Sequence, residues 1–218
     1  MNKTAVIFDL DGVIVDTAKY HYLAWKKLAN KLGFDFTHEQ NELLKGVSRV
    51  KSLEILLNIG DVSLSQQEKQ QYMHEKNEHY LSFITQMNES EMLPNMMTIL
   101  KFLKEKGIAI ALGSASKNAK LILDTLQITQ YFDEIIDGNE VSKAKPDPEV
   151  FILAAHRLNK KPEECIVVED AAAGIDAANA ANMLCIGIGE KEILKEATYV
   201  FKSTSELTTE FLDKLIKK

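Results

Sequence analysis

A short apolar run that ends in two carboxylates constrains this chain most. The run follows Lys3 and reaches Phe8, and the sequence Asp9-Leu10-Asp11-Gly12 comes directly after it. Such a run, bounded by a turn signal, predicts a buried parallel strand. Side chains two residues apart on a strand point to the same side, so Asp9 and Asp11 can face one pocket. Taken alone, the stretch fits either a functional acid pair at a strand end or a polar Asp-Gly turn.

From about residue 94 onward, the chain alternates between strand patterns and helix patterns. Apolar runs typical of strands lie at residues 108–112, 134–136, 165–168, 184–188 and 199–201. Helix patterns separate them, including a short one near residues 192–196 and a C-terminal one that Ser203 and Glu206 are expected to cap. Such alternation predicts a parallel sheet with helices on both faces. We therefore expect an α/β fold whose core is a Rossmann-like parallel sheet.

Residues 17–90, which lie between the first strand and the alternating part, show only helix patterns. An amphipathic spacing begins near Tyr20 and ends near Gly33. The later helices have polar start signals, which are Thr37 with Gln40, Ser48, and Ser65 with Glu68. We interpret residues 17–90 as an inserted all-helical cap domain, and residues 1–16 and 91–218 as the catalytic core.

The net charge of -6 limits the classes of partner. An acidic chain is not typical of a protein whose main partner is nucleic acid or an anionic membrane, although a local basic cluster or a metal can still bind small anions. No apolar stretch approaches the roughly 18 residues that a membrane span needs, and the N-terminal run is too short for a signal peptide. Cys165 and Cys185 lie in or beside apolar runs and are expected to be buried free thiols. We therefore expect a cytoplasmic protein.

Three further groups of polar residues follow predicted strands, and the carboxyl ends of parallel strands share one edge of a sheet. The groups are the turn Ser114-Ala115-Ser116-Lys117-Asn118, the pair Lys145-Pro146, and the pair Glu169-Asp170. Hydroxyls and free backbone N–H groups suit a phosphate, and a lysine supplies positive charge. Two acids together with Asp9 suit Mg²⁺, which prefers oxygen ligands. Each group alone also has a structural explanation, as a helix cap, a solvated lysine or surface acids.

Together the groups predict phosphoryl transfer. A carboxylate can attack a phosphoryl group and hold it as an aspartyl phosphate. A second acid can then give or take the proton of the oxygen that leaves or attacks. Asp9 comes first on the strand and is assigned as the nucleophile, and Asp11 as the general acid/base. A metal ion would offset the repulsion between these carboxylates.

The string Phe8-Asp9-Leu10-Asp11-Gly12-Val13, followed by Asp16-Thr17, resembles the first motif of the haloacid dehalogenase-like phosphotransferases. Ser114, Lys145 and Glu169-Asp170 resemble the second, third and fourth motifs. The resemblance covers the whole chain, including a helical cap after the first motif. It implies that Asp9, Asp11, Ser114 and Lys145 are catalytic. It also implies that Mg²⁺ is held by Asp9, Asp11, Glu169 and Asp170, with Asp11 contributing its backbone carbonyl. Ala171 departs from the pattern, because many relatives carry serine or threonine there.

The cap resembles one branch of this family, the β-phosphoglucomutases. The similar stretches are Leu44-Lys45-Gly46-Val47-Ser48-Arg49, His21 with Trp25, Lys76-Asn77 and the turn at residues 114–118. The resemblance implies interconversion of β-D-glucose 1-phosphate and D-glucose 6-phosphate, with glucose 1,6-bisphosphate as the intermediate and the priming phosphoryl donor. The partners would then be small sugar phosphates, and a monomer is the simplest expectation.

The same resemblance assigns roles to residues that face the substrate. Arg49, Ser116, Lys117 and Asn118 would hold the phosphate that is not being transferred, while Gly46 and Val47 would contact the sugar. His21 and Lys76 are interpreted as helping to switch Asp11 into its acid/base position when the cap closes. The implied substrate-binding residues are Asp11, His21, Trp25, Gly46, Val47, Ser48, Arg49, Lys76, Ser114, Ala115, Ser116, Lys117 and Asn118.

Three alternatives remain open at this point. A sugar-phosphate phosphatase would share every core motif and would let water attack the aspartyl phosphate. A phosphoacceptor signalling domain also uses an aspartyl phosphate, acids, a hydroxyl and a Lys-Pro pair. Its nucleophile would follow a middle strand, however, and it would lack the helical insertion after Asp16. A dehalogenase is less favoured, because Asp11 and the metal-binding acids would have no evident role.

Overall fold

The computed structural model describes residues 3–44 and 47–216 and contains a six-stranded sheet in the order β3-β2-β1-β4-β5-β6. Every pair of neighbouring strands is parallel. The strands are β1 (Ala5–Phe8), β2 (Ala109–Gly113), β3 (Glu134–Ile136), β4 (Cys165–Glu169), β5 (Leu184–Ile188) and β6 (Tyr199–Phe201). The predicted α/β fold with a parallel sheet is confirmed.

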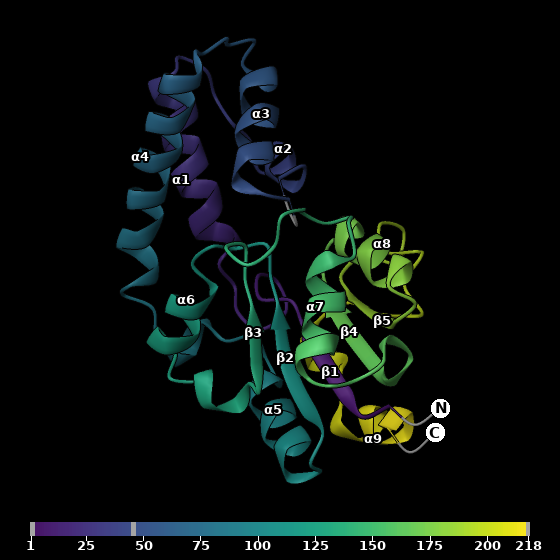
Figure 1. Cartoon of the computed structure of the whole chain (residues 1–218). Helices are drawn as coiled ribbons and strands as arrows, with labels where there is room; N and C mark the ends of the chain where they lie inside the picture. The colour runs from purple at the N-terminus through teal and green to yellow at the C-terminus, as the bar shows by residue number, and fades with distance from the viewer. Residues whose placement is uncertain (1–2, 45–46, 217–218) are drawn as a thin grey trace.

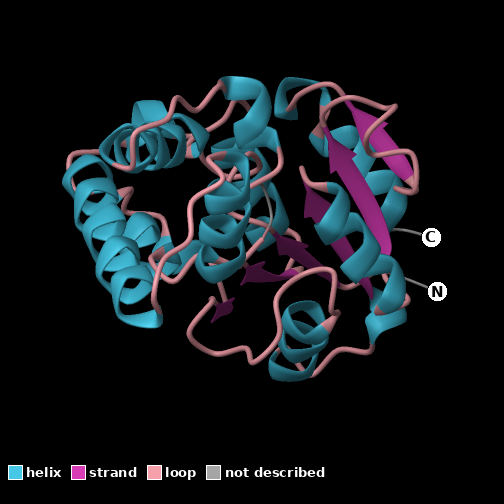
Figure 2. Cartoon of the chain, turned by 90° about the horizontal axis from the view of Figure 1, so that it is seen from above, coloured by secondary structure: helices cyan, strands magenta, loops and turns pink. Residues whose placement is uncertain are grey.

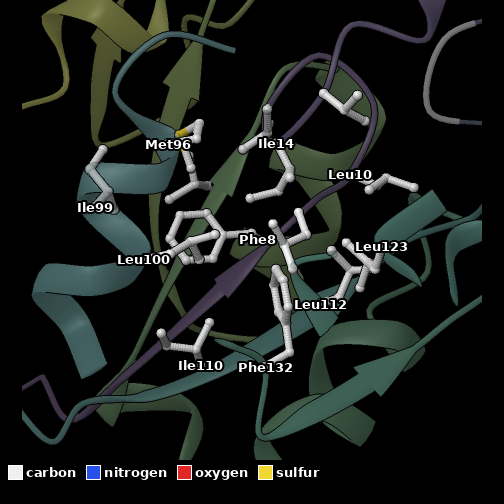
Figure 3. Packing of buried hydrophobic residues seen from close by; sticks show 14 of the residues in the cluster. Phe8, Leu10, Ile14, Met96, Ile99, Leu100, Ile110, Leu112, Leu123 and Phe132 are labelled. Carbon is white, nitrogen blue, oxygen red and sulfur yellow. The ribbon is translucent and has the colours of Figure 1, made fainter. Parts of the chain in front are cut away.

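Helices cover both faces of this sheet (Figures 1 and 2). They are α5 (Met96–Glu105), α6 (Ala119–Thr125), α7 (Glu149–Arg157), α8 (Ala172–Ala180) and α9 (Thr209–Ile216). All four side chains of the central strand β1 are buried. Because successive side chains on a strand point to opposite sides, both faces of β1 are covered. Val6 and Phe8 join one apolar cluster, and Ala5 and Ile7 join the other. Figure 3 shows Phe8 among side chains from the neighbouring strand and from α5.

The helical block consists of α1 (Ala18–Lys31), α2 (His38–Glu42), α3 (Arg49–Ile59) and α4 (Gln66–Ile84). It lies above the carboxyl edge of the sheet and has its own apolar cluster, which includes Trp25, Phe36 and Leu56 (Figure 1). The predicted capping boxes at Thr37 and Ser65 are both present, and the Ser48 side chain accepts from the Lys51 backbone N–H. The predicted helix starts in this block are therefore confirmed.

The helical block joins the sheet through two chain segments that run side by side. The Asp16 N–H donates to the Glu91 carbonyl at 3.0 Å, and the Leu93 N–H donates to the Ile14 carbonyl at 3.0 Å. Val15 and Met92 form an antiparallel bridge between these two bonds. We propose that this paired crossing is the hinge between a cap of residues 17–90 and a core of residues 1–16 and 91–218.

Two local predictions are wrong. Residues 192–196 form turns rather than a helix, because a short local pattern is easily overridden by tertiary contacts. Ser203 and Glu206 do not cap the C-terminal helix, because Thr204–Glu206 is a separate 3-10 turn in which Glu206 accepts from the Lys202 N–H. The helix α9 starts later, where the Thr208 hydroxyl accepts from the Phe211 N–H.

Both cysteines, Cys165 and Cys185, are buried and unpaired as predicted. The helix α8 begins after Ala171, which makes no side-chain cap because alanine has no oxygen to offer. Across the described part of the chain, none of the helices combines the length and the apolar character needed to cross a membrane.

Candidate active site

A cavity of about 580 Å³ lies between the carboxyl edge of the sheet and the helical block. Its walls bring together most of the residues that the sequence singled out. Lys145 and Glu169 are buried behind the wall instead, and Gly46 lies outside the described residues. The predicted residues that line the cavity are Asp9, Asp11, His21, Trp25, Val47, Ser48, Arg49, Lys76, Ser114, Ala115, Ser116, Lys117, Asn118 and Asp170.

Three carboxylates gather at one end of this cavity. Asp9 follows β1, Glu169 ends the adjacent parallel strand β4, and one carboxylate oxygen from each lies within 4.8 Å of one from Asp170. Glu169 Oε1 is buried without a hydrogen-bond partner. Gly12 has φ +77°, and a Cβ there would collide with the Asp170 carboxylate, so glycine is what allows the close approach. This donor set, with an orphaned oxygen, fits a hard divalent cation such as Mg²⁺.

Lys145 balances the charge of two of these acids. Its side chain is 1% exposed, and its Nζ lies 2.6 Å from Asp9 Oδ1 and 3.3 Å from Glu169 Oε2. Burial alone would lower the pKa of Lys145, but the charges of Asp9 and Glu169 outweigh burial and raise it above its usual value. Lys145 therefore stays protonated and holds the Asp9 carboxylate in position.

Asp11 has a different environment from Asp9. Burial, followed by the charges of Asp9 and Asp170, raises the pKa of Asp11 to about 8. Its Oδ1 atom is buried without a hydrogen-bond partner. A carboxyl group with such a pKa is largely protonated at neutral pH and can donate a proton. The Asp9 carboxylate, which pairs with Lys145, suits a nucleophile, and the protonated Asp11 beside it suits a general acid.

The cap side of the cavity carries basic side chains. Lys76 Nζ lies 3.0 Å from His21 Nδ1 and 4.6 Å from the centroid of the Trp25 ring. Burial and the charge of Arg49 lower the pKa of Lys76 to about 7. Burial and the charge of Lys76 lower the pKa of His21 well below its usual value. The His21 imidazole is therefore neutral and can accept from Lys76.

The turn after β2 closes the remaining wall. Ser114 is 1% exposed, and its hydroxyl accepts from the Ser116 N–H at 3.1 Å. The Ser116 hydroxyl in turn accepts from the Asn118 N–H at 3.3 Å. The Asn118 side chain donates to Asn77 of α4 at 3.0 Å, so this turn is bonded directly to the helical block.

Comparison with known proteins agrees with this geometry. Residues 3–182 match the model of the haloacid dehalogenase-like hydrolases. The chain belongs to this family. A β-phosphoglucomutase of Bacillus subtilis (strain 168) is 43% identical over 95% of this chain and 93% of its own length. A phosphorylated carbohydrates phosphatase of Thermotoga maritima is 32% identical over 82% of each chain. The crystal structure of a β-phosphoglucomutase from Clostridium difficile superposes with a TM-score of 0.94 at 45% identity, covering 99% of this chain and 97% of that one.

Some residues of this haloacid dehalogenase-like chain line the cavity although no sequence motif points to them. Asn41 of α2 and Ser52 of α3 are buried in its wall, and Asn41 Oδ1 has no hydrogen-bond partner. Gly138 and Val141 come from the chain after β3. Single polar residues on short helices carry no motif, so only the placement of α2 and α3 at the cavity could reveal them.

The buried Lys76 predicts an unusual pH dependence of stability. Its pKa is about 7 in the folded chain and 10.5 for an unperturbed lysine, so folding releases a proton at pH values between these two. The unfolded chain then binds more protons, and the free energy of unfolding contributed by Lys76 rises with pH from about 7 to 10. Lys76→Met should remove this slope, and at pH 7 it should be more stable than the parent by about 3 to 5 kcal/mol.

Urea unfolding at pH 7 and pH 10 measures both effects. The exposed Lys120, which pairs with Asp124, provides the control as Lys120→Met. That variant should keep the parental pH slope. Equal pH slopes in Lys76→Met and the parent would show that Lys76 is not held uncharged by burial.

Proposed function

We propose that this chain is a Mg²⁺-dependent β-phosphoglucomutase that interconverts β-D-glucose 1-phosphate and D-glucose 6-phosphate. The observation that carries the proposal is one cavity that combines a cluster of acids with several basic side chains. Asp9 and Asp170 line the wall with Glu169 and Lys145 buried behind them, and Arg49 and Lys117 contribute positive charge to the same cavity. A mutase that works through a bisphosphate must bind a reacting phosphoryl group and a second phosphate at once.

The first half of the cycle starts from the phosphorylated form of Asp9, for which glucose 1,6-bisphosphate is the priming donor. The deprotonated Asp11 takes the proton from the sugar C6 hydroxyl as that oxygen attacks phosphorus. The bond between phosphorus and Asp9 breaks, which gives the bisphosphate and frees the Asp9 carboxylate. Lys145, 2.6 Å from Asp9 Oδ1, stabilises the carboxylate that is released.

The second half follows after the bisphosphate turns around in the cavity. Asp9 attacks the phosphoryl group on C1, and Asp11 gives its proton to the departing C1 oxygen. D-Glucose 6-phosphate is released and the aspartyl phosphate is restored. Asp9, Glu169 and Asp170, with the Asp11 carbonyl, would hold Mg²⁺. When bound, Mg²⁺ would neutralise negative charge on these acids and on the transferring group.

The cap residues support a mutase over a phosphatase. His21, Lys76 and Arg49 give the cap side groups that can bind a sugar phosphate and exclude water from the aspartyl phosphate. The core motifs alone would serve a phosphatase equally well, and a Thermotoga maritima relative carries that name. We further propose that the chain acts as a monomer in the cytoplasm, and that the cap closes over the sugar phosphate about the paired segments at residues 14–16 and 91–93.

Phosphorus NMR separates the two activities. The protein is mixed with Mg²⁺, β-glucose 1-phosphate and a trace of glucose 1,6-bisphosphate. A mutase should produce glucose 6-phosphate without matching inorganic phosphate. Inorganic phosphate as the main product would establish the phosphatase instead, and the absence of both products would overturn the proposal.

Arg49→Ala should mainly impair use of the sugar phosphate. Arginine can hold a phosphate through two parallel hydrogen bonds, and losing such a charge-assisted pair costs about 3 kcal/mol, or roughly 100-fold in kcat/KM. Steady-state kinetics with β-glucose 1-phosphate measures the loss. Lys51, exposed on the same helix and bonded to Glu54, gives the control Lys51→Ala, which should stay near the parental value. An unchanged kcat/KM in Arg49→Ala would contradict its role on the distal phosphate.

A further inference from the structure

The turn after β3 contacts the turn after β2 through a row of backbone carbonyls. The Gly138 N–H donates to the Ser116 carbonyl at 3.2 Å, and Asn139 Nδ2 donates to the Lys117 carbonyl at 3.0 Å. A Cβ on Gly138 would collide with the carbonyl oxygen of Ala115. Three consecutive carbonyls of the 114–118 turn therefore face residues 138 and 139.

This contact fixes which way the peptide N–H groups point. In a trans peptide the N–H is directed opposite to the C=O of the same unit. Because the Ser116 and Lys117 carbonyls face the β3 turn, the N–H groups of Lys117 and Asn118 face away from it. The Asn118 N–H donates to the Ser116 hydroxyl. Within the described residues, the Lys117 N–H makes no hydrogen bond, so it remains available to an anion.

The Asn139 side chain is itself held in place. Asp137 is buried, and its Oδ1 accepts from the Asn139 N–H at 2.7 Å, while its Oδ2 accepts from Asn139 Nδ2 at 3.1 Å. The two hydrogens of Nδ2 are thus used by Asp137 and by the Lys117 carbonyl. Asn139 has no side-chain donor left for a ligand. Any effect of Asn139 on a ligand must therefore act through the peptide between Lys117 and Asn118, whose carbonyl it holds.

Strand order explains why these turns meet. The strands β2 and β3 are parallel neighbours, with Gly113 in register with Ile136, and the Ser114 N–H donates to the Ile136 carbonyl at 2.9 Å. Both strands end at the same edge of the sheet. The turn that follows β3 therefore leaves the sheet directly beside the turn that follows β2.

We infer that Asp137-Gly138-Asn139 braces the 114–118 turn, and that Asn139 is a positioning residue for the phosphate that is not being transferred. The inference deepens the proposed function and rests on it. Loss of the Asn139 bond would let the Lys117–Asn118 peptide rotate. The Ser116–Lys117 peptide adjoins it, so the free Lys117 N–H would no longer be held toward the phosphate. Chemistry at Asp9 would be unaffected, because Asn139 bonds to Asp137 and to the Lys117 carbonyl and not to Asp9, Asp11 or Glu169.

The test compares a substrate that has a second, non-transferred phosphate with one that lacks it. Acetyl phosphate can phosphorylate Asp9 but carries no second phosphate and no sugar. Asn139→Ala and the bulkier Asn139→Leu should each raise KM for β-glucose 1-phosphate about fivefold, as expected for one lost hydrogen bond, with little change in kcat. The rate at which acetyl phosphate phosphorylates Asp9 should stay at the parental value in both variants.

Asn179→Ala is the matched control. Asn179 is also an exposed asparagine whose Nδ2 donates to a backbone carbonyl at 3.0 Å, that of Glu196, and it lies outside the cavity wall. It should leave both substrates unchanged. An unchanged KM in the Asn139 variants, or an equal loss with acetyl phosphate, would overturn the positioning role.

The outcome for Asn139 can be separated from the outcome for the function. The wild-type protein tests the function, because it must form glucose 6-phosphate from β-glucose 1-phosphate. If it releases inorganic phosphate instead, the mutase proposal fails, and KM for hydrolysis of glucose 1,6-bisphosphate, which carries a second phosphate, replaces the mutase KM in the Asn139 comparison. A fivefold rise there would still support the brace, and no rise would still overturn it.

Discussion

Asp9→Asn is expected to abolish turnover while the chain stays folded. The amide cannot act as the nucleophile, so the aspartyl phosphate cannot form, and removal of a covalent nucleophile lowers kcat by roughly 10⁴-fold or more. Asparagine has nearly the same shape as aspartate. Its oxygen can still accept from Lys145 Nζ, which also remains paired with Glu169 at 3.3 Å.

A coupled assay for glucose 6-phosphate, together with the intact mass after treatment with acetyl phosphate, measures the effect. The variant should gain no phosphoryl group, and its thermal transition should remain cooperative. Asp35→Asn, which changes an acid on the cap surface that pairs with Lys26, serves as the control and should retain full activity. Turnover close to the parental rate in Asp9→Asn would remove Asp9 from the role of nucleophile.

Lys145→Met is expected to cause a large loss of stability in the metal-free protein. The lysine is 1% exposed and lies between Asp9 and Glu169, so its removal leaves two buried carboxylates without a balancing charge. Breaking a buried ion pair from one side costs about 3 to 5 kcal/mol. Mg²⁺ should recover part of this loss, because ion binding to the folded state alone adds stability.

Urea unfolding with and without Mg²⁺ tests this expectation. Lys143 lies two residues earlier and forms an exposed pair with Asp147 at 3.3 Å, which makes Lys143→Met the matched stability control. An exposed pair contributes about 0 to 1 kcal/mol, so that variant should unfold near the parental midpoint. A Lys145→Met protein as stable as Lys143→Met without Mg²⁺ would show that the buried charges do not depend on Lys145.

The sequence was sufficient to predict the sheet and the convergence of the acids. Asp9 and Glu169-Asp170 both follow apolar runs, and parallel strands end at one edge, so their proximity required no knowledge of side-chain packing. The burial of Lys145 was not predictable. A lysine before a proline is usually solvated, and only the path of the chain after β3 places it beneath Asp9.

The contribution of Asn139 was hidden for a related reason. It depends on β3 lying next to β2, and the order of strands in a sheet cannot be predicted from the sequence of a single strand or turn. The wrong helix at residues 192–196 and the misplaced cap at Ser203 share another cause. Both rest on short local patterns, which tertiary contacts easily override.

The antiparallel pairing of residues 14–16 with residues 91–93 has a consequence for how such a chain can change. The chain between these segments leaves the core and returns to it at the same place, where two backbone hydrogen bonds join the outgoing and returning segments. A different inserted domain would need only to connect to these two neighbouring ends of the core chain. The helical block that we propose as the substrate-binding cap can therefore be exchanged as a module, while the groups proposed to make and break the bond to phosphorus remain unaltered.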